Sequence, residues 1–483
     1  MGIKYRVVAR AAGTAGALTG IAMLPALAVS LVFREYREAA GFAVCIVITL
    51  LLAGATCLSS RARTATDPEP RLRDAMLIVS VWWFVSSVLG GLPYMACGVL
   101  SGPADALFES ASGFTTTGAT VLPALAELPR GLALWRSVTG WLGGLEILAA
   151  SLALLPPAGL YAAARIESSA SLSERLPARE RGAALRLFAV YAGGSLLLFL
   201  LLRVASTAPF DALILALGAV STSGFSGRAD GTVEVSDAAA FFLCAFMLLA
   251  AVNFTLYRRF SARLGKRILR DEELRCFFLA LGCAACAIGL YFLIALPHGN
   301  ALRDIGNAFF ETASALTTTG CHRAAVFSWP PFCKLILLFC ALMGGCVAST
   351  AGGIKVGRIL ILLRLLRRNI SVRLHPNAVL AIKFDGKAVP TDTVNAVVAH
   401  AMLCIVVFFV AMTIVSLDGA GESGDSVFDV LACMSNAGPS LAATDWAAYG
   451  PPTKVFLSFL MILGRLEFTA VLLLFTPRYW KND

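Results

Sequence analysis

Charged residues are scarce in this chain. Only 14% of its 483 residues are Asp, Glu, Lys or Arg, whereas soluble domains carry about 25%. Its four histidines are dispersed, and the apolar stretches contain neither paired carboxylates nor a nucleophile motif. The low charge excludes an ordinary soluble domain, and the lack of catalytic groups argues against an enzyme embedded in a membrane.

The 13 cysteines lack the spacing of a metal or redox site. Most lie within apolar stretches, and the CxxC pair Cys283 and Cys286 has no second pair and no nearby histidine. Buried free cysteine behaves as a small apolar side chain. We therefore expect packing residues rather than metal ligands, and no tightly bound cofactor.

Long apolar runs are abundant instead, and 58% of the residues are hydrophobic. A helix needs about 20 apolar residues to cross a bilayer. Ten runs predict an all-α polytopic membrane protein with a retained first span and both termini on one side, and the eighth run is interrupted by polar, glycine-rich sequence. The expected spans are residues 11–33, 40–58, 75–95, 132–155, 185–204, 238–257, 274–296, 332–366, 394–417 and 453–475.

Basic residues gather in alternate loops, after the second, fourth, sixth and eighth spans. Such loops remain cytoplasmic in membrane proteins, so we expect both termini to be cytoplasmic. The net charge of +10 then reflects membrane topology and not nucleic-acid binding. The clusters are Arg61, Arg63, Arg71 and Arg73; Arg165, Arg175, Arg179, Arg181 and Arg186; Arg258, Arg259, Arg263, Lys266, Arg267 and Arg270; and Arg364, Arg367, Arg368, Arg373, Lys383 and Lys387.

A hydroxyl-rich phrase ending in glycine occurs four times. FESASGFTTTG ends at Gly118 and FETASALTTTG at Gly320, while the weaker copies ALGAVSTSG and LACMSNAG end at Gly224 and Gly438. After the first two spans, each phrase lies in a hairpin between two spans. This pattern predicts four membrane–pore-loop–membrane repeats in a pseudo-fourfold arrangement, preceded by two extra N-terminal transmembrane helices. The expected units are residues 1–70, 71–165, 166–265, 266–375 and 376–483.

Each phrase follows an apolar run too short to span, at 105–110, 211–217, 305–313 and 427–434. Such a run can re-enter the membrane if its backbone is buried in protein or lines a watery cavity. A permeating cation exchanges its water shell for backbone carbonyls, and glycine adopts the unusual dihedrals that aim them. A single TTTG is more often a turn or a helix cap, but four copies in matching positions favour a cation filter. Its expected residues are Thr116, Thr117, Gly118, Thr222, Ser223, Gly224, Thr318, Thr319, Gly320, Asn436, Ala437 and Gly438.

The four phrases occur together with four further motifs. These are WRSVTGWLGGLE (135–146), GGCVASTAGGIKVGR (344–358), HPNAV (375–379) and GRLEFTAVLLLFTPRYW (464–480). The combination, over about residues 75–480, resembles the TrkH branch of the Trk/Ktr/HKT superfamily of potassium transporters, and the two extra N-terminal spans also suit this branch.

The resemblance implies potassium uptake across a bacterial cytoplasmic (inner) membrane, with K⁺ as the transported ion. It also implies a homodimer, and gating by a cytosolic nucleotide-binding RCK ring of the TrkA type. A serine in place of the first filter glycine is linked to sodium permeation in the wider family. All four positions here are glycine, which implies preference for potassium.

The eighth span contains four glycines within ten residues. Each interior glycine costs a helix about 1 kcal/mol relative to alanine, so we expect local unwinding. The residues alone fit either a close-packing site for neighbouring helices or a movable loop beneath the filter, and the resemblance favours the movable loop as a gate. Its residues would be Gly344, Gly345, Ser349, Thr350, Gly352, Gly353 and Lys355.

Arg465 lies inside an apolar run of the tenth span. A charge at mid-membrane costs at least about 2.5–3.5 kcal/mol, so such a residue is expected to have a function. We predict that Arg465 faces the pore and opposes cation passage, as the resemblance also implies. Glu467 is two residues on and would point away from Arg465 on a helix, so we expect no direct pair.

Five residues raise open questions. Glu146 places a carboxylate in the fourth span, where the family usually has glycine, and it would either pair with a base or be protonated. Ser223 and Ser440 also replace usual glycines beside the filter. Glu109 and Glu311 would either attract cations to the outer mouth or, as we favour, brace the pore helices.

A cation-coupled secondary transporter, a proton or sodium symport with potassium, is the alternative function. Broken helices at inverted repeats would support it, but the four repeats here share one orientation. No buried chain of Asp, Glu and His suggests a proton relay, which favours passive permeation. Glu146 keeps coupling open.

Overall fold

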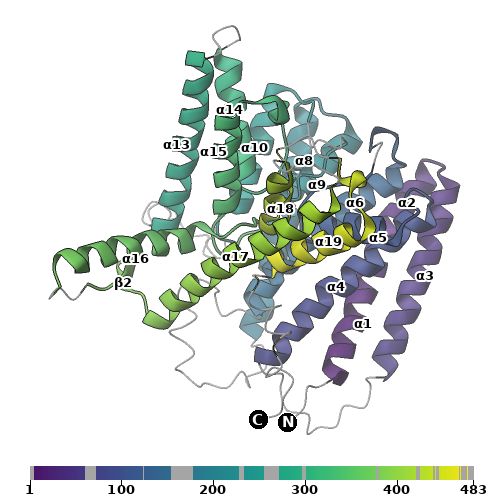
Figure 1. The fold of residues 1–483 in the computed structure, drawn as a ribbon. Coiled ribbons are helices and arrows are strands. Elements are labelled where there is room, and N and C mark those ends of the chain that lie inside the picture. Colours follow the sequence, from purple (N-terminus) through teal and green to yellow (C-terminus); the bar gives the residue numbers. More distant parts are fainter. Residues whose placement is uncertain are drawn as a thin grey trace.

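The computed structural model describes residues 5–59, 72–122, 125–153, 178–227, 233–254, 271–295, 301–376, 380–419, 425–438 and 445–466, with 441, 468 and 476. This part of the chain is almost entirely helical (Figure 1). The basic loops at 61–71, 165–175 and 258–270, on which the expected orientation depends, lie outside the described residues.

The expected spans correspond to a set of main helices. Six spans in the described chain are long and apolar enough to cross a membrane, the first of them formed by α1 and α2 together. These helices are α1 (Tyr5–Ala22), α2 (Leu24–Val32), α3 (Tyr36–Ser59), α4 (Leu72–Ala96), α6 (Arg130–Ala153), α8 (Ala178–Val204), α10 (Asp237–Ala251), α13 (Glu272–Ala295), α15 (Pro331–Met343), α17 (Thr391–Asp418) and α19 (Pro451–Arg465).

The first expected span is broken between α1 and α2. Pro25 lies in the first turn of α2. Proline has no backbone N–H and clashes with the carbonyl four residues earlier, which accounts for the break in the helix at this point.

Each short apolar run forms a short helix directly before its glycine phrase. Helices α5 and α9 have a proline in the first turn. Proline lacks an N–H group, and at this position the N–H group of any other residue would have no intrahelical acceptor. These pore helices are α5 (Pro103–Phe114), α9 (Pro209–Ser221), α14 (Ala301–Leu316) and α18 (Asp425–Ser435). After three of the phrases a single 3-10 turn precedes the next main helix, at Leu125–Glu127, Val326–Ser328 and Trp446–Ala448.

The pore helices pack in a closed cycle. Each one contacts the two main helices that flank it in sequence, as α5 does with α4 and α6. Each also contacts the second main helix of the preceding repeat: α9 packs on α6, α14 on α10, α18 on α15, and α5 on α19. The contact between α5 and α19 joins the last repeat to the first, so the four repeats surround one axis as expected.

The two-helix extension packs on the first repeat. Helices α1 and α3 contact α4, and α2 contacts α6 (Figure 1). Glu35, between α2 and α3, accepts hydrogen bonds from the backbone N–H of Arg130 at 2.7 Å and Gly131 at 3.0 Å. These two N–H groups lie in the first turn of α6, where no intrahelical acceptor exists.

The eighth expected span is two separate helices. Helix α15 ends at Met343, and α16 (Val356–Leu374) then runs crosswise to α13 and α15, away from the main body (Figure 1). The segment between them, residues 344–355, is called the intramembrane loop below.

A short hairpin, β1 (Lys383–Phe384) and β2 (Lys387–Ala388), lies beside α16 and was not expected from the sequence. Its turn residues Asp385 and Gly386 both have positive φ, at 47° and 75°. Such a turn matches the twist of two paired strands, and Asp-Gly favours it.

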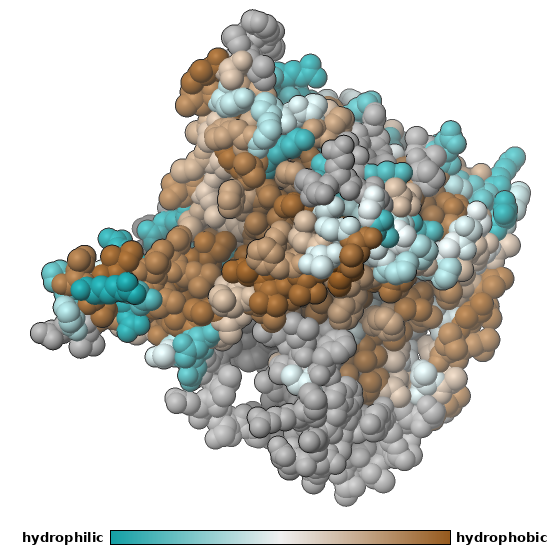
Figure 2. Space-filling view, in the orientation of Figure 1, coloured by the Kyte–Doolittle hydropathy of each residue, from teal (hydrophilic) through white to brown (hydrophobic). Residues whose placement is uncertain are grey.

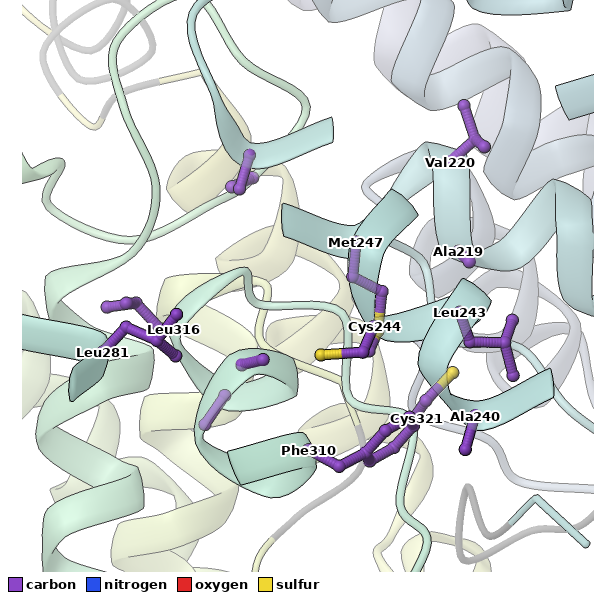
Figure 3. Close-up of a cluster of buried hydrophobic side chains, with 14 of the residues drawn as sticks. Ala219, Val220, Ala240, Leu243, Cys244, Met247, Leu281, Phe310, Leu316 and Cys321 are labelled. Atoms are coloured by element: carbon purple, nitrogen blue, oxygen red, sulfur yellow. The ribbon is translucent and has the colours of Figure 1, made fainter. Parts of the chain in front are cut away.

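Apolar side chains fill the core between the repeats. Figure 3 shows Leu243 and Met247 of α10 with Leu316 of α14 in one buried cluster, and Cys321, the residue after Gly320, lies in it too. Large apolar side chains cover the outside, including Phe241, Ile294 and Phe339, each more than two-thirds exposed. On the face in Figure 2 they form a broad apolar band with hydrophilic surface above it, as expected of a membrane protein.

Candidate functional site

The four glycine phrases share one backbone shape. The glycine that ends each phrase has positive φ, at 83° for Gly118, 62° for Gly224, 76° for Gly320 and 89° for Gly438. The residue two positions earlier is also left-handed in every repeat, with φ between 51° and 57°, at Thr116, Thr222, Thr318 and Asn436. Left-handed backbone is uncommon for residues with a side chain, so the same deviation in four places shows that the repeats are structurally equivalent.

The four glycines lie against one another. A methyl group on Gly224 would lie 1.8 Å from the carbonyl oxygen of Thr319, and one on Gly118 would lie 2.3 Å from that of Ser223. A methyl group on Gly438 would lie 2.4 Å from the Cα of Gly320, and that on Gly118 would lie 3.3 Å from the Cα of Gly438. The contacts run from the first repeat through the fourth and back, so the phrases form a ring, and a methyl group would clash at Gly118, Gly224 and Gly438.

Hydroxyl pairs hold three of the four phrases. The residues one and three positions before the glycine share a hydrogen bond: Thr117 with Thr115 at 2.8 Å, Ser223 with Ser221 at 2.9 Å, and Thr319 with Thr317 at 2.7 Å. Ser223, the departure noted in the sequence, therefore takes the place of threonine in this pair.

The fourth phrase is held differently, because Ala437 has no hydroxyl. Its Asn436 amide donates to Thr117 Oγ1 at 2.9 Å and to the Met461 carbonyl at 3.0 Å. This side chain connects the fourth phrase to the first and to α19.

Buried carboxylates brace three of the four pore loops. Each lies nine residues before the filter glycine, at Glu109, Glu311 and Asp429, and is at most 1% exposed. Glu109 accepts from the N–H of Val121 at 3.0 Å, and Glu311 from the N–H of Arg323 at 2.6 Å and of Ala324 at 3.1 Å.

Asp429 accepts from the Tyr449 hydroxyl at 2.7 Å. Because all three carboxylates are buried and hydrogen-bonded, they brace the loops and do not form an exposed acidic mouth.

The second repeat has Leu215 at this position, and a cation from the first repeat does the bracing. Arg136 of α6 forms an ion pair with Glu109 at 2.7 Å and donates to the Ser226 carbonyl, two residues after Gly224, at 3.1 Å. Its guanidinium also lies 3.9 Å from the Phe225 ring centre. One buried arginine thus fastens two neighbouring pore loops.

We predict that Glu109→Gln destabilises the protein strongly, because it leaves Arg136 buried without a counter-charge. Breaking a buried pair in this way costs about 3–5 kcal/mol. The melting temperature of the purified protein would measure the loss. Asp429→Asn is the matched control, since its partner Tyr449 is a neutral donor and the variant leaves no buried arginine without a counter-charge, so it should lower the melting temperature less. An equal fall in both variants would contradict the ion-pair role.

The intramembrane loop is an ordered segment paired with the end of α10. The N–H groups of Cys346 and Thr350 donate to the carbonyls of Ala251 at 2.9 Å and Ala250 at 3.3 Å. The expected unwinding is observed, with Gly344 at φ 69° and Gly353 at φ 77°. The close-packing reading also fits, since a methyl group on Gly344 would lie 2.2 Å from the Gly352 carbonyl oxygen.

The intramembrane loop touches the filter from one side. Gly352 N–H donates to Thr318 Oγ1 at 2.6 Å, and Gly353 N–H donates to the Ser435 carbonyl at 2.9 Å. Ser349 and Lys355 bond within the loop, to the carbonyls of Cys346 and Ala351. The loop therefore adjoins the third and fourth filter phrases.

Arg465 reaches the intramembrane loop from α19. Its Nη1 donates to the Thr350 carbonyl at 2.7 Å, while Nε and Nη2 have no acceptor among the described residues, although the residue is only 4% exposed. Helix α19 ends at Arg465, so this residue lies at a helix end and not within a continuous tenth helix as expected. Most of residues 467–475, including Glu467, lie outside the described residues, as does Ser440.

Glu146 lies in α6, near Arg465. Its Oε2 is buried and has no hydrogen-bond partner among the described residues, and the residue is close enough to Arg465 for the two charges to interact. The two side chains lie near each other without forming a direct ion pair.

The comparisons with known proteins agree with this geometry. A family model described as TrkH, cation transport protein, matches residues 40–482. The chain belongs to the TrkH family. The resemblance drawn from the sequence motifs is thus confirmed.

Relatives in the TrkH family match the whole chain. The Trk system potassium uptake protein TrkH of Halomonas elongata is 32% identical over 99% of this chain and 100% of its own. TrkG of Escherichia coli is 31% identical over 99% of both. The crystal structure of the potassium transporter TrkH from Vibrio parahaemolyticus matches with a TM-score of 0.90 and 30% identity, over 99% of this chain and 100% of that one.

The sequence reasoning missed some of the site. Asp429 has the same nine-residue spacing as Glu109 and Glu311, which was a usable signal. Arg136 and Glu273, which holds the intramembrane loop, gave no local signal, because their partners lie 27 to 90 residues away in sequence.

Proposed function

We propose that this chain takes up potassium through a channel-like pore whose filter is the ring of four glycine phrases. The observation that carries the proposal is the cyclic contact of Gly118, Gly224, Gly320 and Gly438. Potassium is the transported ion named for the family members above, and all four ring positions are glycine, as expected of a potassium-selective filter.

The chemistry of the ring suits a dehydrated cation. Carbonyl oxygens of Ser223 and Thr319 lie at the contacts between phrases and can replace water around K⁺ without adding a full charge. Threonine hydroxyls add oxygens, and Thr116 Oγ1 is buried without a hydrogen-bond partner among the residues that the structure describes. Each pore helix ends at its phrase, so its negative dipole end favours a cation there.

The gate would be the intramembrane loop together with Arg465. The loop bonds to Thr318 and Ser435 directly beside the filter, and Arg465 holds the loop through Thr350. A positive charge at this constriction opposes K⁺ passage. Opening would then require the loop to release its hydrogen bonds and Arg465 to move.

The biological setting follows from the family. The chain would work as a homodimer in a bacterial inner membrane, with both termini and the basic loops in the cytoplasm. A cytosolic nucleotide-binding RCK ring of the TrkA type would bind on that side and control the gate. Alternate loops rich in basic residues support this orientation.

Proton or sodium symport with potassium is the second candidate, and the buried Glu146 oxygen, which has no hydrogen-bond partner within the described part of the chain, supports it. Flux of K⁺ into proteoliposomes at clamped voltage, with and without a pH or sodium gradient, separates the two functions. We expect uptake that follows the electrochemical potential of K⁺ alone, in both the wild type and Glu146→Gln. Uptake driven by a pH gradient and lost in Glu146→Gln would establish proton coupling, and uptake driven by a sodium gradient would establish sodium symport.

A further inference from the structure

Two neighbouring carboxylates at the start of α13 contact different structures. Glu273 is 7% exposed, and its Oε1 accepts hydrogen bonds from the N–H of Val347 at 2.9 Å and of Gly357 at 3.1 Å. Val347 lies near the start of the intramembrane loop, and Gly357 lies just past its end. A single carboxylate oxygen therefore fastens both ends of the loop.

Glu273 also completes the start of α16. The N-cap residue of that helix, Lys355, makes no side-chain cap, so the first N–H groups need an acceptor from elsewhere. A carboxylate at a helix N-terminus is favoured by the helix dipole. The position of the loop and the start of α16 thus depend on the same side chain.

Glu272 binds the hairpin. Its Oε2 accepts from the N–H of Asp385 at 3.0 Å, and the Glu272 N–H donates to Asp385 Oδ1 at 3.0 Å. Arg364 of α16 forms an ion pair with Glu272 at 2.8 Å and also donates to the Lys383 carbonyl. The hairpin, α16 and the first turn of α13 are therefore linked by reciprocal bonds.

The geometry points to Glu272 and Glu273 as positioning residues that couple the β1–β2 hairpin to the intramembrane loop. The hairpin follows α16 in the chain region whose basic residues predict a cytoplasmic position. A protein partner that pulls on the hairpin or on α16 would displace the first turn of α13 through Glu272. Because Glu273 is the next residue in that turn, the same movement would release Val347 and Gly357. The consequence for transport rests on the proposed role of the loop as gate.

Hydrogen–deuterium exchange of the full-length protein in nanodiscs tests the coupling without relying on transport. We expect Glu273→Gln to speed exchange in peptides covering 344–357 by about tenfold, because the charged acceptor becomes a neutral amide oxygen and both N–H bonds to it weaken. Glu38→Gln, the same change in the first turn of α3, is the matched control and should leave these peptides unchanged.

Glu272→Gln is the deciding variant, since the contacts of Glu272 within the described residues are with Asp385 and Arg364 and not with the intramembrane loop. Faster exchange both in the hairpin and in peptides 344–357 supports the coupling. Faster exchange in the hairpin alone, or in neither, overturns it. A melting temperature near that of the wild type ensures that the faster exchange reports a local change. Asp385→Asn weakens the same link from the hairpin side and provides a second test with the same two outcomes.

Potassium flux through the same variants separates this inference from the proposed function. Faster loop exchange with raised flux supports both. Faster loop exchange with unchanged flux supports the coupling but contradicts the gate.

Discussion

Gly224→Ala is expected to reduce potassium flux by at least about tenfold and to lower selectivity for K⁺ over Na⁺. The new methyl group would lie 1.8 Å from the Thr319 carbonyl oxygen, and Gly224 has φ of 62°. Left-handed backbone costs a residue with a side chain about 1–2 kcal/mol, and the clash adds to this cost. Since about 1.4 kcal/mol is a factor of ten in an equilibrium constant, a displaced ring should bind K⁺ much less well.

Gly227→Ala is the matched control. It lies three residues further along the same segment, yet a methyl group there meets no atom within 4 Å. Flux of ⁸⁶Rb⁺ or K⁺ into proteoliposomes, with Na⁺ as competitor and protein density matched, would compare the two variants. Normal flux and selectivity in Gly224→Ala would show that this ring is not the filter.

Arg465→Ala is expected to raise potassium flux about tenfold in the absence of any regulator. The variant removes a buried positive charge beside the filter and the hydrogen bond that holds the Thr350 carbonyl. Two unit charges 4 Å apart interact by about 4 kcal/mol at an effective dielectric constant of about 20, so even a third of this repulsion corresponds to about tenfold in rate.

Arg465→Lys separates the two contributions of this arginine. It keeps the positive charge but loses the planar guanidinium, whose Nη1 holds the Thr350 carbonyl. Flux close to that of the wild type in Arg465→Lys would assign the barrier to the charge, and flux close to that of Arg465→Ala would assign it to the bond to the loop. Unchanged flux in Arg465→Ala would remove this residue from the gate.

Local patterns in the sequence predicted the elements well. Apolar runs of about twenty residues became the main helices, and the shorter runs became α5, α9, α14 and α18. The glycines of the eighth span predicted its break, which lies between Met343 and Val356. These features depend on residues close together in the chain, so a single sequence is sufficient to reveal them.

Contacts between repeats could not be predicted from local sequence patterns. Nothing near Leu215 indicates that Arg136 supplies the missing brace, and nothing near Ala437 indicates that Asn436 bonds to Thr117. The end of α19 at Arg465 was also unexpected, because the apolar run continues past it. Each of these features depends on a partner from another repeat.

The class of protein, the four equivalent pore phrases and the family could be predicted from the amino-acid sequence alone, because hydropathy, glycine and hydroxyl patterns are local properties. The folded structure was needed to show that the phrases meet in a ring, that the intramembrane loop pairs with α10, and that Glu273 fastens both ends of that loop. The physical reason is that buried polar groups must find partners wherever the fold brings them, and those partners lie up to hundreds of residues away in the chain.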